Sequence, residues 1–272
     1  MAVTTEQYRE GLTNKESFLI STLARSDKKV FTIEDAKEIA GEQAIKMLIN
    51  LIKKKWILKL KRGLYIIIPL DIGVKGADSF IMHNFVIASK LVEPYYISYW
   101  SALNHYGFSD QIPASTFIAT TKAKKGLKIL DTSYLFVQVS KSRFFGTTDI
   151  EIGGEKVKIS DMNKTIADCL DHPEHAGGID EIARSVYFSI EEIDIKKIVK
   201  YAQRMGNVTI IKRLGYILDE CGLLDKYRAI FDKIELSKGY SLLDPLSPKK
   251  GKYNDKWLLL INRELKPERW MY

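Results

Sequence analysis

Side chains suited to reading DNA bases form one stripe near the N-terminus. Gln43, Lys46, Asn50 and Lys53 follow one another at intervals of three, four and three residues, which places them on one face of a helix. Glutamine and asparagine amides can bind adenine through two hydrogen bonds, and lysine can reach guanine or phosphate. Met47 and Lys54 flank this stripe. The residues of this helix expected to contact DNA are Gln43, Lys46, Met47, Asn50, Lys53 and Lys54.

A second basic group follows directly. Residues 57–60 and 64–68 are prone to form strands, and Lys59, Lys61 and Arg62 lie in or beside the turn between them. We expect these three side chains to contact backbone phosphate, which supplies most of the affinity and little of the sequence information. Any single lysine could also belong to a solvated helix face. A helix followed by a basic hairpin can also be a module that docks proteins. The joint arrangement favours DNA.

Three helices must position these side chains. Thr13 and Glu16 form a capping-box pattern for a helix over residues 14–26. Thr32 caps a short second helix, which Gly41 ends. The third helix, over residues 42–54, has an expected inner stripe of Ala44, Ile45, Leu48, Leu51 and Ile52. Followed by a hairpin that stops at Pro69, this order predicts a winged helix-turn-helix domain over residues 1–75.

The charge distribution is consistent with a polyanion partner for this segment. Of the 272 residues, 42 are Lys or Arg and 34 are Asp or Glu, so the formal net charge is +8. The first 70 residues hold 13 of the basic and 8 of the acidic residues, hence +5 of that charge. A basic segment joined to a nearly neutral remainder indicates nucleic acid, although a generally basic proteome would give the same sign.

The remainder, residues 76–272, has strands first and helices after. We expect strands over 116–121 and 134–140, a hairpin over 149–159 that turns at Gly153-Gly154, and a late strand over 257–261. The expected helices cover residues 80–91, 97–107, 162–170, 179–188, 195–205, 208–221 and 225–236. The predicted fold class is α+β, with a larger mixed α/β domain that has a mostly antiparallel sheet and C-terminal helices.

This second domain offers one further candidate binding surface. Lysines surround a turn at Gly126, and two more basic residues follow the next strand. The predicted second basic patch consists of Lys122, Lys124, Lys125, Lys128, Lys141 and Arg143. A solvated loop is the alternative interpretation.

The sequence offers few groups for catalysis or metal binding. His172 and His175 have a metal-like spacing around Glu174, but no further ligand follows at a sensible spacing and Pro173 interrupts the helix, which favours a plain loop. A hairpin that carries Asp149, Glu151 and Glu155 beside Lys156 and Lys158 leaves a nuclease as an alternative, as does a solvated hairpin. Since the sequence has no glycine-rich phosphate loop or nucleophile elbow, we expect no enzyme, metal or cofactor.

The cysteines and the apolar segments bear on where the protein is located. The two cysteines, Cys169 and Cys221, lie far apart in helical segments and form no CxxC motif, which indicates buried thiols in a reducing compartment. The first residues contain no apolar run typical of a signal peptide, and no apolar stretch is long enough to span a membrane. We therefore expect a cytoplasmic protein without membrane contact.

Several short motifs resemble one known family. They are residues 101–107 (SALNHYG), 159–170 (ISDMNKTIADCL), Gly177-Gly178 and residues 212–218 (KRLGYIL), together with residues 62–65 (RGLY). Their order behind the winged helix resembles the AbiEi-type antitoxins of abortive-infection, type IV toxin–antitoxin systems, over roughly residues 10–262. Asp168 and Arg213 lie inside apolar helices of these motifs, where such residues pair or cap.

This resemblance implies a specific function. The N-terminal domain would bind inverted repeats in double-stranded promoter DNA and repress its own operon. Residues 76–272 would form the antitoxin domain, assist self-association on DNA and antagonise a nucleotidyltransferase-like toxin without a stable complex. The resemblance implies no catalytic residue. The alternative is a stand-alone winged-helix regulator whose C-terminal domain senses a ligand or docks a partner protein; a toxin gene next to this one would favour the antitoxin.

Overall fold

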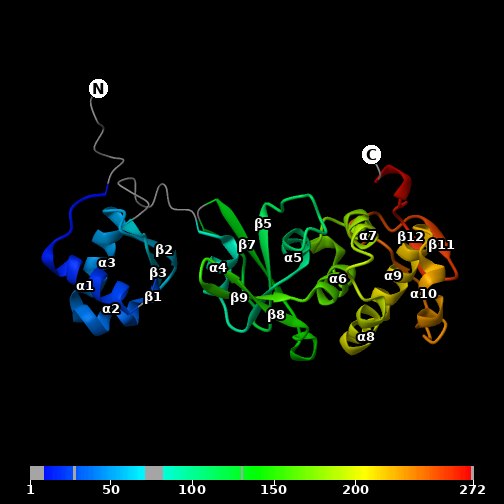
Figure 1. The fold of residues 1–272 in the computed structure, drawn as a ribbon, viewed down its shortest axis with the longest axis horizontal. Helices are drawn as coiled ribbons and strands as arrows, with labels where there is room; N and C mark the ends of the chain where they lie inside the picture. The colour runs from blue at the N-terminus through cyan, green and yellow to red at the C-terminus, as the bar shows by residue number, and fades with distance from the viewer. Residues whose placement is uncertain (1–8, 27–28, 71–81, 130, 271–272) are drawn as a thin grey trace, which may run out of the picture. The chain divides into compact units, whose positions relative to one another are not determined.

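The chain folds as two compact units, which are described separately. The structure, a computed structural model, describes residues 9–26, 29–70, 82–129 and 131–270 (Figure 1). The first unit is Met1–His83 and the second is Asn84–Tyr272. The expected boundary between residues 75 and 76 lies outside the described residues, as does the start of the helix expected from residue 80.

The N-terminal unit contains three helices and a small antiparallel sheet. Its elements are α1 (Asn14–Arg25), β1 (Val30–Thr32), α2 (Ile33–Ala40), the 3-10 turn η2 (Gly41–Gln43), α3 (Ala44–Lys53), β2 (Ile57–Lys61) and β3 (Leu64–Ile67). The strand order is β1-β3-β2, and both pairs are antiparallel. The expected helices and hairpin are present within two residues of the predicted bounds, whereas β1 was not predicted.

Local signals define the helix ends of this unit. Thr13 and Glu16 form a complete capping box before α1, and Thr32 and Asp35 form another before α2. Gly41 follows α2 with a φ of 56°, a left-handed conformation that suits glycine. The predicted caps are therefore confirmed. The helices then bury one apolar side each against the sheet, in a core that includes Leu19, Leu23, Phe31, Leu48, Leu51 and Ile57.

Glu16 also links two helices through charge. Its carboxylate is 2% exposed and accepts a hydrogen bond from Lys54 Nζ, which follows α3, at 2.6 Å. Burial disfavours the charged carboxylate, but the hydrogen bonds from Lys54 and Thr13 outweigh burial, so the pKa of Glu16 lies below its ordinary value. The ionised carboxylate thus stabilises the packing of α1 against the end of α3.

A Glu16→Gln variant is expected to lower the stability of this unit by about 1–3 kcal/mol at neutral pH, because a charged hydrogen-bond partner is lost. Because the pKa of Glu16 is lowered in the folded chain, its carboxylate contributes its full stability at pH values above the pKa that Glu16 has in the unfolded chain. This contribution disappears as the pH falls through the pKa of Glu16 in the folded chain. Hydrogen exchange of α1 and α3 amides measures it. Glu34→Gln, at an exposed position of α2, is the matched control; an equal effect there would refute the assignment.

The C-terminal unit is built on a six-stranded sheet with the order β6-β7-β5-β4-β9-β8. The strands are β4 (Tyr95–Ile97), β5 (Ser115–Thr120), β6 (Leu127–Ile129), β7 (Thr132–Gln138), β8 (Thr147–Ile152) and β9 (Glu155–Ser160). Among these described strands three pairs are antiparallel and two, β5 with β7 and β4 with β9, are parallel. The sheet is thus mixed, less antiparallel than predicted. The β8–β9 hairpin turns at Gly153 and Gly154, both with positive φ, as expected.

Among the described residues of this unit, two helices flank β4 in the sequence, and five more follow the six-stranded sheet. They are α4 (Asn84–Ser89), α5 (Tyr99–His105), α6 (Met162–Asp171), α7 (Ile179–Phe188), α8 (Ile195–Met205), α9 (Val208–Glu220) and α10 (Leu224–Phe231), with 3-10 turns η5 (Lys141–Arg143), η6 (Pro173–His175) and η7 (Pro267–Arg269). In Figure 1, α6 lies between the sheet and the α8–α10 end of this unit. A small sheet of β10 (Ser241–Leu242), β12 (Leu259–Ile261) and β11 (Lys252–Asn254) completes it.

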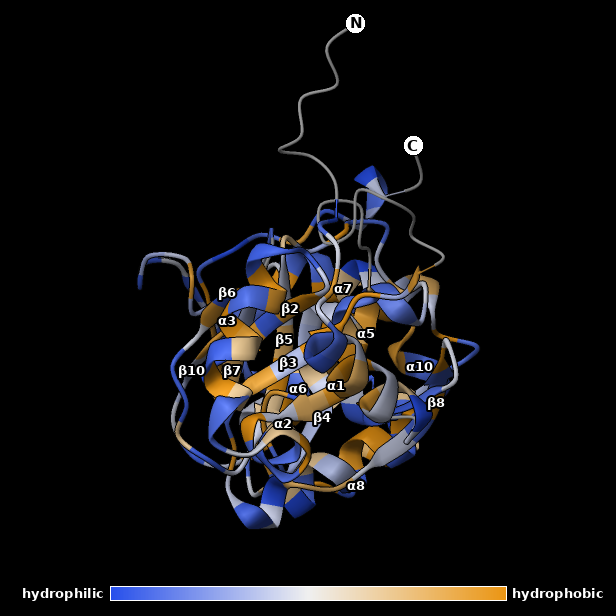
Figure 2. Cartoon of the chain, turned by 90° about the vertical axis from the view of Figure 1, so that its left-hand side faces the viewer, coloured by the Kyte–Doolittle hydropathy of each residue, from blue (hydrophilic) through white to orange (hydrophobic). Residues whose placement is uncertain are grey.

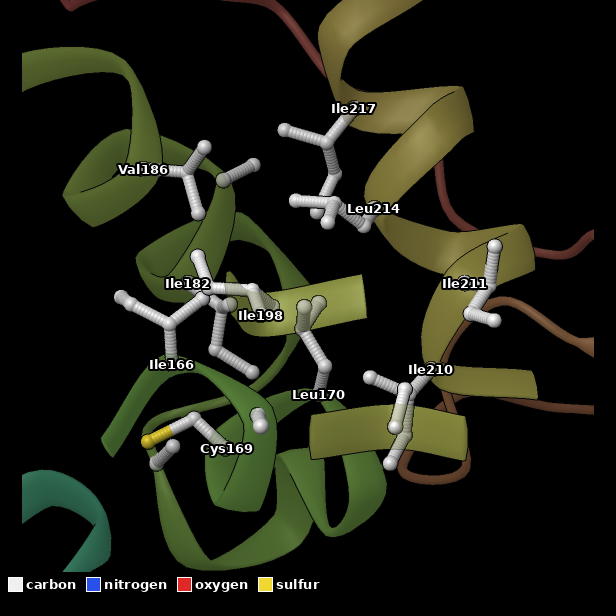
Figure 3. Packing of buried hydrophobic residues seen from close by; sticks show 14 of the residues in the cluster. Ile166, Cys169, Leu170, Ile182, Val186, Ile198, Ile210, Ile211, Leu214 and Ile217 are labelled. Atoms are coloured by element: carbon white, nitrogen blue, oxygen red, sulfur yellow. The ribbon is translucent and has the colours of Figure 1, made fainter. Parts of the chain in front are cut away.

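The main core of this unit lies between the later helices. Isoleucine, leucine and valine side chains from α6, α7, α8 and α9 converge there (Figure 3). The labelled members include Ile166, Leu170, Ile182, Val186, Ile198, Leu214 and Ile217. The same core takes in residues of the sheet, such as Phe117 and Ala119. The mixed α+β class predicted from the sequence is therefore present.

Candidate nucleic-acid interface

The exposed side of α3 combines basic, amide and aliphatic side chains. Lys46 and Lys53 are exposed, and Asn50 is half-buried. Ile45 and Ile49 are 46% and 50% exposed, which is unusual for isoleucine. Colouring by hydropathy shows both polar and apolar residues along this helix (Figure 2). Because α3 buries its opposite side in the core, these five side chains are held on a rigid support.

The two residues expected to flank the stripe, Met47 and Lys54, are held within the unit. Met47 is 8% exposed and belongs to the core. Lys54 forms the ion pair with Glu16, and its side chain is 18% exposed. The assignment of Ile45 to the inner side and of Met47 to the outer side was wrong, because the helix turns Met47 inward together with Leu48. Spacing alone could not distinguish these choices.

Gln43 is placed differently from the rest of the stripe. It ends η2, just before α3, and its Oε1 accepts a hydrogen bond from Lys15 Nζ at 3.1 Å. It also lines a hollow of about 450 Å³ beside Phe18, which is 65% exposed. Its amide would have to exchange Lys15 for a base before it could read DNA. Asn50 is thus the better-placed amide.

The β2–β3 turn presents its basic residues unequally. Lys59 and Arg62 are exposed, and Gly63 allows the turn with a φ of 76°. Lys61 is half-buried, and this burial lowers the pKa of its amine. A register shift between Lys59 and Lys61 accompanies the change of orientation. Arg62 and Lys59 are consequently the stronger candidates for phosphate contacts.

The predicted second basic patch divides into separate parts. Lys122 follows β5, and Lys141 follows β7. These strands are parallel and Thr120 lies opposite Gln138, so both lysines lie at the edge of the sheet where the two strands end. Lys128 lies opposite Ser133, near the start of β7. A strand of this length spans about 20 Å, so Lys128 is near the other edge.

Two members of that patch have structural roles instead. Lys124 Nζ donates to the carbonyl oxygen of Leu91 at 2.5 Å and lies over the Phe136 ring. Arg143 forms an ion pair with Asp171 at 2.8 Å and donates to the carbonyl of Met205 at 3.0 Å. Lys125 is exposed in the loop before β6. The six residues therefore do not lie together on one surface, and the alternative of solvated loops fits Lys122, Lys125 and Lys128, which are exposed.

The acidic hairpin offers no convergent carboxylates. Lys158 Nζ donates to Asp149 Oδ1 at 2.8 Å, and this hydrogen bond lowers the pKa of Asp149. Glu151 lies directly opposite Lys156 in the ladder. Glu155 forms an ion pair with Lys90 at 2.9 Å. Each carboxylate thus has a lysine beside it, as the alternative of a solvated hairpin predicts.

A buried polar cluster occupies the conspicuous motif at residues 159–170. Lys164 is fully buried on α6 and forms an ion pair with Asp168, which is 2% exposed. Asp168 Oδ2 accepts hydrogen bonds from Tyr96 at 3.1 Å and from Ser98 at 2.8 Å. Burial and the nearby Asp168 charge raise the pKa of Tyr96 well above its ordinary value. The expectation that Asp168 is paired is confirmed, and this cluster ties α6 to the region of β4.

Arg213 has the expected structural role as well. Arg213 is 5% exposed, and its guanidinium donates to the carbonyls of Leu170 and Leu242, at 2.5 Å and 2.9 Å. Burial lowers its pKa to about 10. It satisfies carbonyl groups near the end of α6, where the helix itself leaves them unpaired.

The histidine pair follows α6: His172 comes directly after the helix and His175 ends η6. His172 Nδ1 is 2.9 Å from Glu174 Oε1, and one ligand atom from each of His172, Glu174 and His175 lies within 4.8 Å of the others. The rings of His172 and His175 are 5.7 Å apart. Burial lowers the pKa of His175. The sequence suggested a plain loop, but the fold brings all three side chains together.

Comparison with known proteins gives a fold relationship. The crystal structure of the Rv2827c protein from Mycobacterium tuberculosis is similar to this chain, with a TM-score of 0.69 over 95% of this chain and 94% of that chain. No family model and no curated protein matches the sequence. At 14% identity the likeness to Rv2827c shows a shared fold only. Over the described residues no helix is long and apolar enough to cross a membrane.

Sequence reasoning missed three features near the candidate sites. The exposed pair Ile45 and Ile49 was hidden because apolar residues are normally assigned to the core. The burial of Lys164 could have been suspected from its i, i+4 spacing to Asp168 within an apolar helix. Asp171 was not singled out, because its ion pair with Arg143 connects distant segments, although its contact with the next residue, His172, is local.

Proposed function

We propose that residues 9–70 form a winged helix domain that binds double-stranded DNA, with α3 in the major groove and the β2–β3 turn on the backbone. The observation that carries this proposal is the exposed side of α3, where Lys46, Asn50 and Lys53 lie on one supported face. Arg62 and Lys59 are exposed in the following hairpin. Basic groups on a helix and on an adjacent turn match the two-part contact that such domains make with DNA.

The face of α3 also suggests which bases it reads. Asn50 can donate to N7 and accept from N6 of adenine. Ile45 and Ile49 can contact the C5-methyl group of thymine, which is the apolar feature of the major groove. Lys46 and Lys53 then contact phosphate or guanine. An operator with A·T pairs under Asn50 and the isoleucines follows from this arrangement.

The wider role that we propose rests on the resemblance to AbiEi-type antitoxins. The protein is then a cytoplasmic, non-enzymatic autorepressor that binds inverted repeats in its own promoter and self-associates there. Its C-terminal unit antagonises a nucleotidyltransferase-like toxin without a stable complex. The pairing of Asp149, Glu155 and Asp168 with lysines supports a role without catalysis at these carboxylates.

Binding of the full chain to fragments of its own promoter tests the DNA-binding role, and Asn50→Ala tests how bases are read. This variant is expected to lose about 1–3 kcal/mol of discrimination at one base pair, because a bidentate contact to adenine is lost. Anisotropy titrations against fragments with single base changes measure the loss. Arg62→Ala, in the turn assigned to the DNA backbone, is the comparison and should weaken binding to all fragments alike. If Asn50→Ala also weakened all fragments equally, direct reading by Asn50 would be excluded.

A further inference from the structure

We propose that His172, Glu174 and His175 form a binding site for a divalent transition-metal ion of the zinc class. The three side chains come from one short segment, the 3-10 turn η6 and the residue before it. One ligand atom from each lies within 4.8 Å of the others. Two imidazole nitrogens and one carboxylate oxygen are donors that zinc and its neighbours prefer, and hard cations such as Mg²⁺ do not favour imidazole.

The spacing of the donor atoms is close to that of a metal tripod. With metal–ligand distances of about 2.0–2.1 Å, ligand atoms of a tetrahedral site lie roughly 3.3 Å apart. His172 Nδ1 and Glu174 Oε1 are already 2.9 Å apart. The 4.8 Å limit on the remaining separations leaves at most about 1.5 Å to be closed, which side-chain rotation can supply. Without a metal, the hydrogen bond between His172 Nδ1 and Glu174 Oε1 holds the two side chains in place.

The surroundings also orient His172 as a metal ligand. While Nδ1 faces Glu174, Nε2 lies 3.5 Å from Asp171 Oδ2 on the other side of the ring. The Asp171 side chain is only 6% exposed and accepts hydrogen bonds from Arg143 at 2.8 Å and from Asn207 at 2.5 Å. A fixed carboxylate behind a histidine is the usual outer partner of a metal-binding imidazole, because it sets the tautomer and the ring orientation.

The site is supported on one side and open on the other. The His175 ring packs against Tyr99 and Phe117, with ring centroids 5.4 Å and 5.7 Å away. The side chains of His172 and Glu174 are 36% and 34% exposed, so an ion can enter from solvent. Three protein ligands leave a fourth position for water or another small ligand, as in zinc sites that are not purely structural.

The test uses the full chain, stripped with a chelator and titrated with ZnCl₂ by calorimetry and with CoCl₂ by visible absorption. We expect about one ion per chain and a cobalt spectrum without a thiolate charge-transfer band, since the ligands are nitrogen and oxygen. Glu174→Gln and His172→Gln should each weaken Zn²⁺ binding by more than about 100-fold. Asp171→Asn should weaken it by about 10–100-fold through ring orientation. Circular dichroism of the metal-free variants checks that they fold.

His105→Ala is the matched control, because it removes an exposed histidine from the same unit but outside the cluster. It should bind Zn²⁺ as the wild type does. The proposal fails if the wild-type chain does not bind Zn²⁺, if folded Glu174→Gln and His172→Gln bind it unchanged, or if cobalt reports a thiolate ligand. None of these readouts involves DNA, so the result is independent of the proposed promoter binding.

Discussion

Replacing Lys164 by methionine is expected to lower the free energy of unfolding of the C-terminal unit by about 3–5 kcal/mol. The fully buried ammonium of Lys164 is the ion-pair partner of Asp168, which is itself 2% exposed. Methionine has nearly the same shape but no charge, so the carboxylate remains buried with only the hydroxyls of Tyr96 and Ser98 as donors. Urea denaturation followed by far-ultraviolet circular dichroism measures the loss.

A double variant separates the charge effect from packing. Lys164→Met combined with Asp168→Leu removes both charges and is expected to recover most of the stability, since a buried ion pair can often be replaced by apolar side chains. Asp168→Leu alone leaves the buried ammonium and should be as harmful as Lys164→Met. If the double variant lost the sum of the two single effects, the pair would not act as one unit, and the contacts of Lys164 with the Tyr96 and Phe145 rings would be the main contribution.

Element bounds were predictable where local chemistry decides them. The helices over residues 179–188 and 195–205 have the predicted bounds, because Gly178 precedes one and Asp194 caps the other, while Gly206 ends it in a left-handed conformation. The strands β4 and β6 were missed because each has three residues, too few to show the alternation of apolar and polar side chains that identifies a strand. Strand order could not be predicted either, since the parallel pairing of β5 with β7 depends on long-range contacts.

The candidate sites show the same division. Residue types and helical spacing were sufficient to place Lys46, Asn50 and Lys53 on one exposed side of α3. They were insufficient for Met47 and Lys54, whose positions depend on the packing of α3 against α1 through Glu16 and the core. The histidine group depends on a residue from outside the predicted motif, Asp171, and on its contact with Arg143 from another segment. Such contacts leave no periodic signal in the sequence.

Replacing Lys46, Lys53 and Arg62 together by alanine is expected to abolish the promoter binding and operon repression that we propose. If each side chain neutralises one phosphate, the slope of log K against log salt falls by about 2–3, and affinity at 0.1 M salt falls by roughly tenfold for each contact. Two of the residues lie on α3 and the third in the β2–β3 turn, so the loss tests both parts of the proposed interface. Anisotropy titrations at several salt concentrations give the slope.

A control variant removes the same number of positive charges from another part of the N-terminal unit. Arg25, Lys29 and Lys37 are exposed in the same unit but outside α3 and the turn, and their triple alanine variant removes the same +3. It should keep most of the slope, because general attraction contributes less than direct phosphate contacts. Equal losses in both variants would mean that the unit binds DNA only through its overall charge, and α3 would lose its assigned role.

Co-expression with the toxin that our proposed function implies, sought in the gene next to this one, tests the role of the C-terminal unit separately from DNA binding. The Lys46, Lys53 and Arg62 triple variant should release a promoter–reporter fusion from repression, yet it should still rescue growth when its level is matched to that of the wild type. This follows because the altered side chains lie in the N-terminal unit, whereas we assign toxin antagonism to Asn84–Tyr272. Loss of rescue at matched levels would tie antagonism to DNA binding. Failure of the wild-type chain to rescue would favour a stand-alone regulator.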